Sequence, residues 1–196
     1  AFAFQDRQQS RMAEKRAIAR AAARLVEPGM TVILDTGTTT LELARVLGDI
    51  PHLTVLTSSL AIASVLLSHK EQELILLGGT VNKNSPDLSG PLTLENLGAF
   101  RAQLAFVGAD GADKHGLYTG GQQTAQVTRA MIANAERAVL LADSSKFGKT
   151  AFARIAGWEA ISHVIVDDGL PSRTRTWLGQ NVKALSLVSA TNQETQ

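Results

Sequence analysis

Short apolar runs alternate with stretches of helical periodicity along most of this 196-residue chain. Three runs of β-branched and aliphatic residues lie in the first half, at 31–34, 53–56 and 74–77. Each run predicts a buried parallel strand, because both faces of such a strand are covered. Between the runs, apolar side chains recur at helical spacing, first around Leu43 and again around Ile62. This alternation indicates an α/β fold with a Rossmann-like, mostly parallel sheet flanked by helices.

The second half of the chain continues this alternation after a break. The break consists of Gly78-Gly79 and a polar stretch at 82–89. Beyond it, helices are predicted at 91–100, at 123–134 and near Thr174, and strands at 104–107, 138–141, 164–166 and 184–187. A leading helix is predicted at 11–26. Because the chain has no internal repeat or low-complexity tract, we expect one domain at 27–196, preceded by an interdomain linker and leading helix at 1–26.

The composition excludes several classes of site. The chain has no cysteine, so disulfide scaffolds, thiolate zinc sites and cysteine nucleophiles are all excluded. The four histidines show neither paired helical spacing nor clustering, so we expect no metal site. No apolar run approaches the roughly 20 residues that a membrane helix needs. We therefore expect a soluble, cytoplasmic protein with no membrane partner.

The first 24 residues are basic, although the whole chain has a formal net charge of only +1. Their basic side chains are Arg7, Arg11, Lys15, Arg16, Arg20 and Arg24, against Asp6 and Glu14. We interpret these side chains as a solvated helix face, because such faces are common, with contact to a phosphate backbone as the alternative. The chain shows no helix-turn-helix pattern, so we expect residues 1–196 to bind DNA weakly at most.

The loop that follows the first predicted strand has the composition of a phosphate site. Its sequence is Asp35-Thr36-Gly37-Thr38-Thr39-Thr40, directly after a strand and directly before a helix. Gly37 permits a tight backbone turn, and the threonine hydroxyls and first helical amides can donate hydrogen bonds to an anion. Capping of the helix by one threonine is the alternative. The loop lacks the Walker and dinucleotide fingerprints, and we expect no cofactor.

Further polar loops follow other predicted strands, and we expect them to meet the first loop at one crevice. They are Thr57-Ser58-Ser59, Gly78-Gly79, Gly108-Ala-Asp110-Gly111-Ala-Asp113 and Asp143-Ser144-Ser145-Lys146. Lys146 is the candidate counter-charge for a phosphate. If the phosphate belongs to a sugar, the candidate contacts to the sugar are Asp35, Ser58, Gly79, Asp110 and Gly111. Each of these residue types is also common in turns, so a purely structural role stays open for each.

Five motifs, in this order, strongly resemble the effector-sensing domain of DeoR-family bacterial transcription repressors. They are Asp35-Thr-Gly-Thr-Thr-Thr40, Leu77-Gly-Gly79, Phe106-Val-Gly-Ala-Asp-Gly111, Arg129-Ala-Met-Ile132 and Asp143-Ser-Ser-Lys-Phe-Gly148. The resemblance covers about residues 14–168, nearly the whole chain. It implies a fold similar to ribose-5-phosphate isomerase, glucosamine-6-phosphate deaminase and CoA transferases. Glu14-Lys-Arg-Ala-Ile-Ala19 resembles the helix that follows an upstream winged helix-turn-helix, which we expect this chain to lack.

The resemblance also implies a function. A phosphorylated sugar or similar small-molecule effector would bind as inducer, and operator DNA would be a partner only through the missing upstream domain. We expect no enzymatic activity. We expect a homo-oligomer, because repressors of palindromic DNA are usually symmetric. Two positions depart from the family pattern, Ser58 in place of an asparagine and Gln126 in place of a glutamate, and ligand choice can differ accordingly.

A sugar-phosphate isomerase is the first alternative, because Asp110-Gly-Ala-Asp113 and Gly120-Gly121 resemble motifs of ribose-5-phosphate isomerase. Proton transfer between adjacent carbons needs a positioned base, which in that isomerase is a glutamate shortly after its glycine run. No Asp or Glu occurs between Asp113 and Glu136, so the most direct catalytic route is absent. Asp110 or Asp35 would have to substitute for that base.

An oligomerisation module that binds no ligand is the second alternative. The alanine-rich helix at 11–26 and the apolar residues Phe2 and Phe4 could make contacts between subunits. The polar crevice argues against this interpretation as a complete account.

Overall fold

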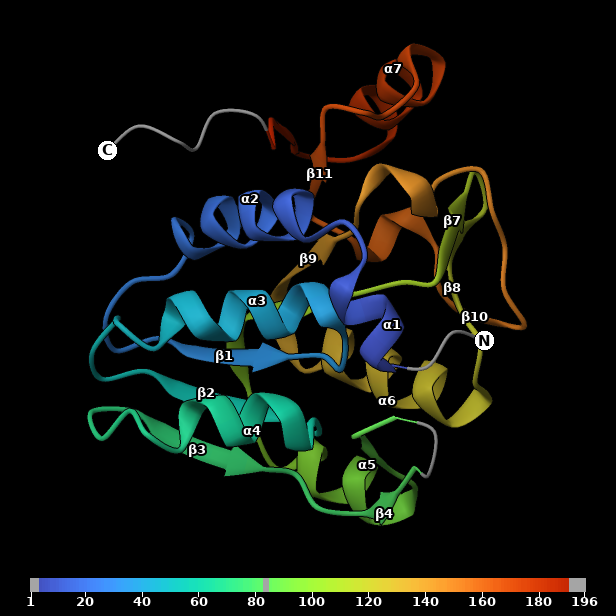
Figure 1. Ribbon diagram of the computed structural model, residues 1–196. Helices are drawn as coiled ribbons and strands as arrows, with labels where there is room; N and C mark the ends of the chain where they lie inside the picture. The colour runs from blue at the N-terminus through green and yellow to red at the C-terminus, as the bar shows by residue number, and fades with distance from the viewer. Residues whose placement is uncertain (1–3, 83–84, 191–196) are drawn as a thin grey trace.

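The computed structural model describes residues 4–82 and 85–190 of the chain (Figure 1). Its helices are α1 (Phe4–Gln9), α2 (Met12–Ala23), α3 (Thr38–Leu47), α4 (Leu60–Leu66), α5 (Pro91–Gly98), α6 (Gln122–Ala133) and α7 (Ser172–Asn181), with short 3-10 helices η1 (Ser144–Lys146) and η2 (Trp158–Ala160). Its strands are β1 (Thr31–Leu34), β2 (Thr54–Thr57), β3 (Glu73–Leu76), β4 (Thr80–Val81), β5 (Leu88–Ser89), β6 (Ala102–Val107), β7 (Gly111–Asp113), β8 (Gly116–Thr119), β9 (Ala135–Leu141), β10 (Ala153–Ala156), β11 (His163–Asp167) and β12 (Leu185–Val188). Within these ranges, no helix combines the length and the apolar character that crossing a membrane requires.

Seven strands form one parallel sheet in the order β12-β11-β9-β6-β1-β2-β3. β1 lies between β2 and β6, with Val32 opposite Val55 on one side and Leu104 on the other. The chain winds outward from β1 in both directions, so the connections after β1 and β6 lead away from each other. Such a switch point leaves a crevice outside the carboxyl ends of the strands. The predicted Rossmann-like α/β sheet is confirmed.

Helices cover both faces of this sheet, with α2, α3 and α4 in front of it in Figure 1. On that face, Ile18 of α2 joins Val32 and Phe106 of the sheet in one apolar cluster. On the other face, Met131 of α6 joins Val107 in a second cluster, to which α5 and α7 also contribute. Successive residues of a central strand point to opposite clusters, so all of them must be apolar. This explains why the strands appear in the sequence as unbroken apolar runs.

β3 is less buried than we predicted. It ends the sheet, so only β2 pairs with it, and Leu76 is 42% exposed. Leu77, just beyond the strand, is buried. An apolar run has the same composition at an edge and at the centre of a sheet, so the pattern alone could not separate the two positions.

The helix that we predicted at 11–26 is α2, and a short helix that we did not predict, α1, precedes it. Arg11 at their junction has a left-handed backbone with φ of 54°. α2 buries three apolar side chains against the sheet, Ile18, Ala19 and Ala22. Phe4 of α1 is half-buried and packs against the same cluster, whereas Phe2 lies outside the described residues. α2 is therefore part of the core of the domain.

A small antiparallel sheet, in the order β10-β8-β7, was not predicted. The segment 108–121 is rich in glycine and resembled a loop, yet Gly111 opens β7 and pairs with Tyr118. β10 completes this sheet from a distant part of the chain, with Ala153 opposite Thr119. Strands this short leave no periodic signal in the sequence. β4 and β5 form a further short antiparallel pair.

Candidate functional site

An open cleft with a volume of about 820 Å³ lies outside the carboxyl ends of β1 and β6. Its walls are the loops that follow β1, β6 and β9, the end of β8, and side chains from α1 and α2. This volume is typical of a small-molecule site. The structure thus brings together the polar loops at 35–40, 108–110 and 143–146 that the sequence placed at one crevice.

The loop at 35–40 presents backbone amides to this cleft. Gly37 is the N-cap residue of α3, and no side chain caps the helix. In the described part of the chain, the amides of Thr38, Thr39 and Thr40 have no hydrogen-bond acceptor. Threonine capping, the alternative to phosphate binding, is therefore not what the structure shows. Free amides at a helix N-terminus favour an anion.

Gly37 matters because it has no side chain, and not because its backbone conformation requires glycine. The chain bends at Thr36 and Gly37, but the φ of 165° and ψ of 164° at Gly37 are extended values that any residue adopts, so the bend does not require glycine for its backbone conformation. A Cβ atom at this position would lie 3.2 Å from Thr40 Oγ1. A larger side chain would therefore crowd the surface where the amides are exposed.

Asp35 joins the two sides of the switch point. Its carboxylate accepts hydrogen bonds from the Thr36 amide at 2.8 Å, the Gly108 amide at 3.1 Å and Thr128 Oγ1 at 3.1 Å. Burial raises the pKa of Asp35 to about 7, against the opposing effect of these three hydrogen bonds. The side chain is only 2% exposed. Asp35 thus holds the loops after β1 and β6 together, in addition to lining the cleft.

Asp110 already has three partners. Its Oδ1 atom pairs with Arg7 Nη1 at 3.0 Å. Its Oδ2 atom accepts hydrogen bonds from Thr119 Oγ1 and from the Gly120 amide, both at 2.9 Å. A sugar hydroxyl that reaches Asp110 would therefore also meet the guanidinium of Arg7.

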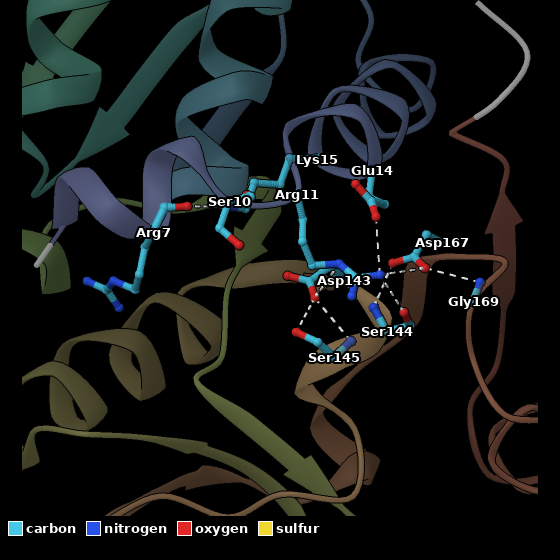
Figure 2. Close-up of polar contacts among 10 residues, drawn as sticks. All are labelled: Arg7, Ser10, Arg11, Glu14, Lys15, Asp143, Ser144, Ser145, Asp167 and Gly169. Atoms are coloured by element: carbon cyan, nitrogen blue, oxygen red, sulfur yellow. Dashed lines mark hydrogen bonds and ion pairs between the residues drawn. The ribbon is translucent and has the colours of Figure 1, made fainter. Parts of the chain in front are cut away.

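Three basic residues of the leading segment, 4–24, turn toward the body of the domain: Arg7 and Lys15 line the cleft, and Figure 2 shows Arg11 among the carboxylates at the strand ends. Lys15 is only 4% exposed, and Arg7 and Arg11 are half-buried. For these three side chains, the interpretation as a solvated helix face is wrong. Arg16 and Arg24 have the same spacing of four residues from Arg20 and are exposed, so spacing alone did not separate the two sets.

Arg11 lies among the carboxylates at the ends of β9 and β11, as Figure 2 shows. Its Nε atom is 3.4 Å from Asp143 Oδ1, and its Nη2 atom is 3.7 Å from Asp167 Oδ2. The same Nη2 atom donates to Ser144 Oγ at 3.1 Å. Asp167 also accepts hydrogen bonds from the amides of Ser144 at 2.6 Å and Gly169 at 3.1 Å. These contacts fix the junction of α1 and α2 to the sheet.

Lys146 of η1 and Lys15 of α2 also line the cleft. Within the described ranges, neither ammonium group has a carboxylate oxygen within 4 Å. Burial lowers the pKa of Lys15, Asp143 opposes this, and the charge of Lys146 lowers it further. The two positive charges are therefore near one another, without a directly paired carboxylate.

A small polar pocket adjoins the cleft on the β2 side. It shares Asp35, Thr36 and Asp87 with the cleft and adds Ser58. Ser58 Oγ and Asp87 Oδ1 are buried and have no hydrogen-bond partner among the described residues. Burial raises the pKa of Asp87. Unpartnered buried polar atoms are costly, so this pocket suits a ligand hydroxyl. The sequence indicated Ser58 but gave no sign of Asp87.

Three positions that the sequence singled out do not line the cleft or the pocket. A Cβ on Gly79, whose φ is +122°, would collide with Thr93 Oγ1. A Cβ on Gly111 would lie 2.7 Å from the Lys149 carbonyl oxygen. Close packing therefore explains why both positions are glycine. Gln126 is exposed and also lies outside the lining.

Three of the four carboxylates that line the cleft are engaged with loop amides, and Asp87 is the exception. Asp35, Asp110 and Asp143 each accept hydrogen bonds from loop amides. No Asp or Glu occurs between Asp113 and Glu136, the stretch in which a ribose-5-phosphate isomerase would place its base. In the described residues, no group of three or more His, Asp or Glu side chains is placed to hold a metal ion.

Comparison with known proteins gives one family. Residues 10–168 match the family described as the DeoR C terminal sensor domain. The chain is 35% identical to the HTH-type transcriptional repressor GlcR of Bacillus subtilis (strain 168), over 82% of this chain and 61% of that protein. It is 29% identical to the glycerol-3-phosphate regulon repressor of Escherichia coli (strain K12), over 84% of this chain and 66% of that protein. The chain thus spans less than two thirds of the length of either relative.

Solved structures share the fold at lower identity. The translation initiation factor eIF-2B of Pyrococcus horikoshii OT3 has a TM-score of 0.54 and 21% identity, over 78% of this chain and 62% of that chain. A D-ribose-5-phosphate isomerase in complex with phospho-erythronic acid has a TM-score of 0.51 and 19% identity, over 68% of this chain and 52% of that chain. At these identities the likeness shows the α/β fold alone, because one fold serves many functions.

Proposed function

This chain belongs to the family of DeoR C-terminal sensor domains, and from that premise we propose that it senses a phosphorylated sugar or related metabolite for a transcriptional repressor. The ligand acts as inducer, by binding one arrangement of the repressor more tightly than another. Relatives such as GlcR are transcriptional repressors, which favours a regulator over an enzyme. The absence of a free carboxylate between Asp113 and Glu136 favours the same conclusion.

One observation carries the proposal: the free amides of α3 and the ammonium groups of Lys146 and Lys15 face one cleft. A phosphomonoester has close to two negative charges and several acceptor oxygens, which such donors satisfy. We assign the phosphate to the loop of Thr36, Gly37, Thr38, Thr39 and Thr40, with Lys146 as counter-charge.

The sugar hydroxyls belong at the other side of the cleft. β2 and β9 lie on opposite sides of β1, so the Ser58 pocket is displaced from Lys146 along the sheet edge. Ser58 and Asp87 offer buried oxygen atoms without partners among the described residues, and Asp110 lies near the cleft beside Arg7. A phosphorylated polyol whose phosphate lies at the lysines and whose hydroxyls reach this pocket would supply hydrogen-bond partners at both places.

The proposal extends to the whole protein. We expect operator DNA to be contacted by a domain upstream of this chain, because the relatives are longer and are transcriptional repressors. We expect a homo-oligomer, because a repressor of a palindromic operator is usually two-fold symmetric.

A ligand screen tests the proposal. Thermal unfolding is followed with sugar phosphates, glycerol 3-phosphate and inorganic phosphate, each beside its unphosphorylated parent where one exists. A ligand that binds the folded chain raises the unfolding midpoint by mass action. We expect a shift with one phosphorylated compound, no shift with its parent, and no turnover of that compound by NMR.

Lys146→Met sharpens the screen, with Lys149→Met as the matched control. Lys149 lies in the same segment and is exposed outside the cleft lining. Removal of a charge-assisted contact should lower the affinity for the phosphorylated ligand by roughly tenfold or more. Lys149→Met should leave this affinity unchanged. Turnover of the ligand would instead establish an isomerase. A panel without any hit would overturn the phosphate assignment.

A further inference from the structure

The leading segment forms one wall of the effector cleft. Arg7 of α1 and Lys15 of α2 line it together with the loops of the parallel sheet. Their side chains reach the strand ends because Arg11, at the junction of the two helices, is held by Asp143 and Asp167 (Figure 2). A ligand in the cleft therefore touches two parts of the molecule that are far apart in the sequence.

Lys15 has hydrogen-bonding capacity to spare. Its Nζ atom donates to the carbonyl oxygen of Arg7 and, at 2.7 Å, to that of Ser10. An ammonium group has three N–H donors, and within the described residues no third acceptor is present. Both acceptors are neutral carbonyl oxygens, and within the described residues no carboxylate oxygen lies within 4 Å of this ammonium group. The desolvation of its charge lowers the pKa of Lys15, and a bound anion would reverse this effect.

Arg7 is in a similar position. Only its Nη1 atom pairs with Asp110, and its Nε atom is buried without a hydrogen-bond partner in the described residues. A guanidinium has five N–H donors, so one ion pair leaves most of its donors available. α1 itself buries no side chain fully, so little other than these polar contacts and the packing of Phe4 holds it in place.

We propose that Lys15 and Arg7 complete the anion site, so that a bound phosphate links the leading segment to the loop at 35–40. Lys15 contacts the phosphate beside Lys146, and Arg7 contacts the same anion or the ligand oxygens next to it. This assignment rests on the proposed function, because it needs a phosphate in the cleft. It adds that the ligand is recognised by the segment that leads into the sensor domain, and that binding stabilises α1 against the sheet.

Two measurements on the 196-residue chain test this assignment, with inorganic phosphate as the probe and potassium chloride at matched ionic strength as the reference. The first is amide hydrogen exchange over residues 4–24. We expect phosphate to slow exchange in α1, because the anion joins α1 to the sheet. The second is phosphate affinity by 31P NMR titration for Lys15→Met, Arg7→Met and Arg24→Met.

Arg24→Met is the matched control, because Arg24 is exposed at the end of α2 and does not line the cleft. We expect roughly tenfold weaker phosphate binding for Lys15→Met, a smaller loss for Arg7→Met, and none for Arg24→Met. Lys15 also holds the end of α1, so Lys15→Met could release that helix. Arg7→Met, which leaves the Lys15 contacts in place, and hydrogen exchange of the unaltered chain keep the test independent of that effect.

The outcomes separate this inference from the proposed function. If Lys146→Met weakens phosphate binding while Lys15→Met and Arg7→Met do not, the leading segment is not part of the site and this inference is wrong. Unchanged exchange of α1 with bound phosphate would overturn it equally. If the unaltered chain binds neither phosphate nor any phosphorylated compound of the screen, the proposed function is wrong as well.

Discussion

Two parts of the cleft rim contain buried polar groups in opposite states. At the ends of β9 and β11, Asp143 and Asp167 accept hydrogen bonds from loop amides and also pair with Arg11. At the end of β2, Ser58 Oγ and Asp87 Oδ1 are buried but have no partner in the described residues. All four residues are at least nine-tenths buried, so burial alone does not distinguish the two parts.

Hydrogen-bond partners, more than position, distinguish the two parts: the partnered groups stabilise the fold, and we propose that the unpartnered ones contact the ligand. A carboxylate with hydrogen-bond partners fixes the loops that donate to it, and its removal leaves their amides without an acceptor. An unpartnered buried group destabilises the free protein, and a ligand that supplies the missing hydrogen bond offsets this cost. Substitutions at the two parts should therefore affect different measurements.

Asp167→Ala should have the largest effect, on stability. The substitution leaves the Ser144 and Gly169 amides without their acceptor and removes one counter-charge of Arg11. We expect a loss of about 3 kcal/mol in the free energy of unfolding, measured in urea. Asp168→Ala, at the exposed neighbouring position, should cost less than about 0.5 kcal/mol. Equal effects at the two positions would show that the contacts of Asp167 do not stabilise the fold.

Gly37→Val should act on binding and hardly on stability. The added side chain covers the free amides of α3 and crowds Thr40, while the extended backbone accepts a β-branched residue. We expect phosphate affinity to fall by about 100-fold, with a change in unfolding free energy below about 1 kcal/mol. Gly179→Ala in α7, where a Cβ meets open space, is the control. A variant with unaltered affinity would show that these amides do not hold the anion.

Asp35 should give the stability a distinctive pH dependence. Its pKa in the folded protein is about 7, raised from the usual 3.8. The folded state therefore binds the proton more tightly, and the stabilisation is fully present below about pH 4 and is lost as the pH rises to 7. From pH 7 to pH 5, the unfolding free energy of the protein should rise by roughly 2 kcal/mol relative to Asp35→Asn. Parallel pH curves for the two proteins, followed in urea, would contradict this.

Ser58→Ala and Asp87→Asn should have the smallest effects on stability. Each replaces a group with an unpartnered atom, so we expect changes within about 0.5 kcal/mol in either direction. Both variants should lower the affinity for the phosphorylated sugar found in the screen by roughly fivefold to tenfold. Both should bind inorganic phosphate normally, because that probe has no sugar hydroxyls. Loss of inorganic phosphate binding would place the phosphate at this pocket instead.

Much of the fold could be predicted, because its causes are local. The central strands are apolar on both faces, and the loop at 35–40 shows its donors directly in the sequence. The small sheet of β7, β8 and β10 was missed because Ala153 pairs with Thr119 across a long stretch of chain. Gly79 and Gly111, which we predicted as ligand contacts, lie outside the lining of the cleft and the pocket. A close backbone or side-chain approach also requires glycine, and the sequence does not separate the two causes.

The partners of the cleft side chains could not be predicted. Arg7, Arg11 and Lys15 have the composition of an ordinary charged helix face, and only the junction between α1 and α2 turns them inward. Asp87 stands in a polar stretch without periodicity, so nothing in the sequence indicated that it is buried beside Ser58. Their roles depend on which chain segment covers them, which is a property of the folded molecule.

The left-handed residue between the first two helices has a mechanical consequence. α2 is a stiff rod fixed to the sheet by Ile18, Ala19 and Ala22, whereas α1 buries no side chain fully and meets α2 at Arg11, a bend with φ of 54°. Tension or torque applied to the chain ahead of Phe4 is therefore absorbed first at this bend. The contacts that resist it include those of Arg7 and Lys15, beside those that Arg11 makes at the bend itself. The compliance of the joint thus depends on the two cations that face the cleft, together with the contacts of Arg11 at the bend.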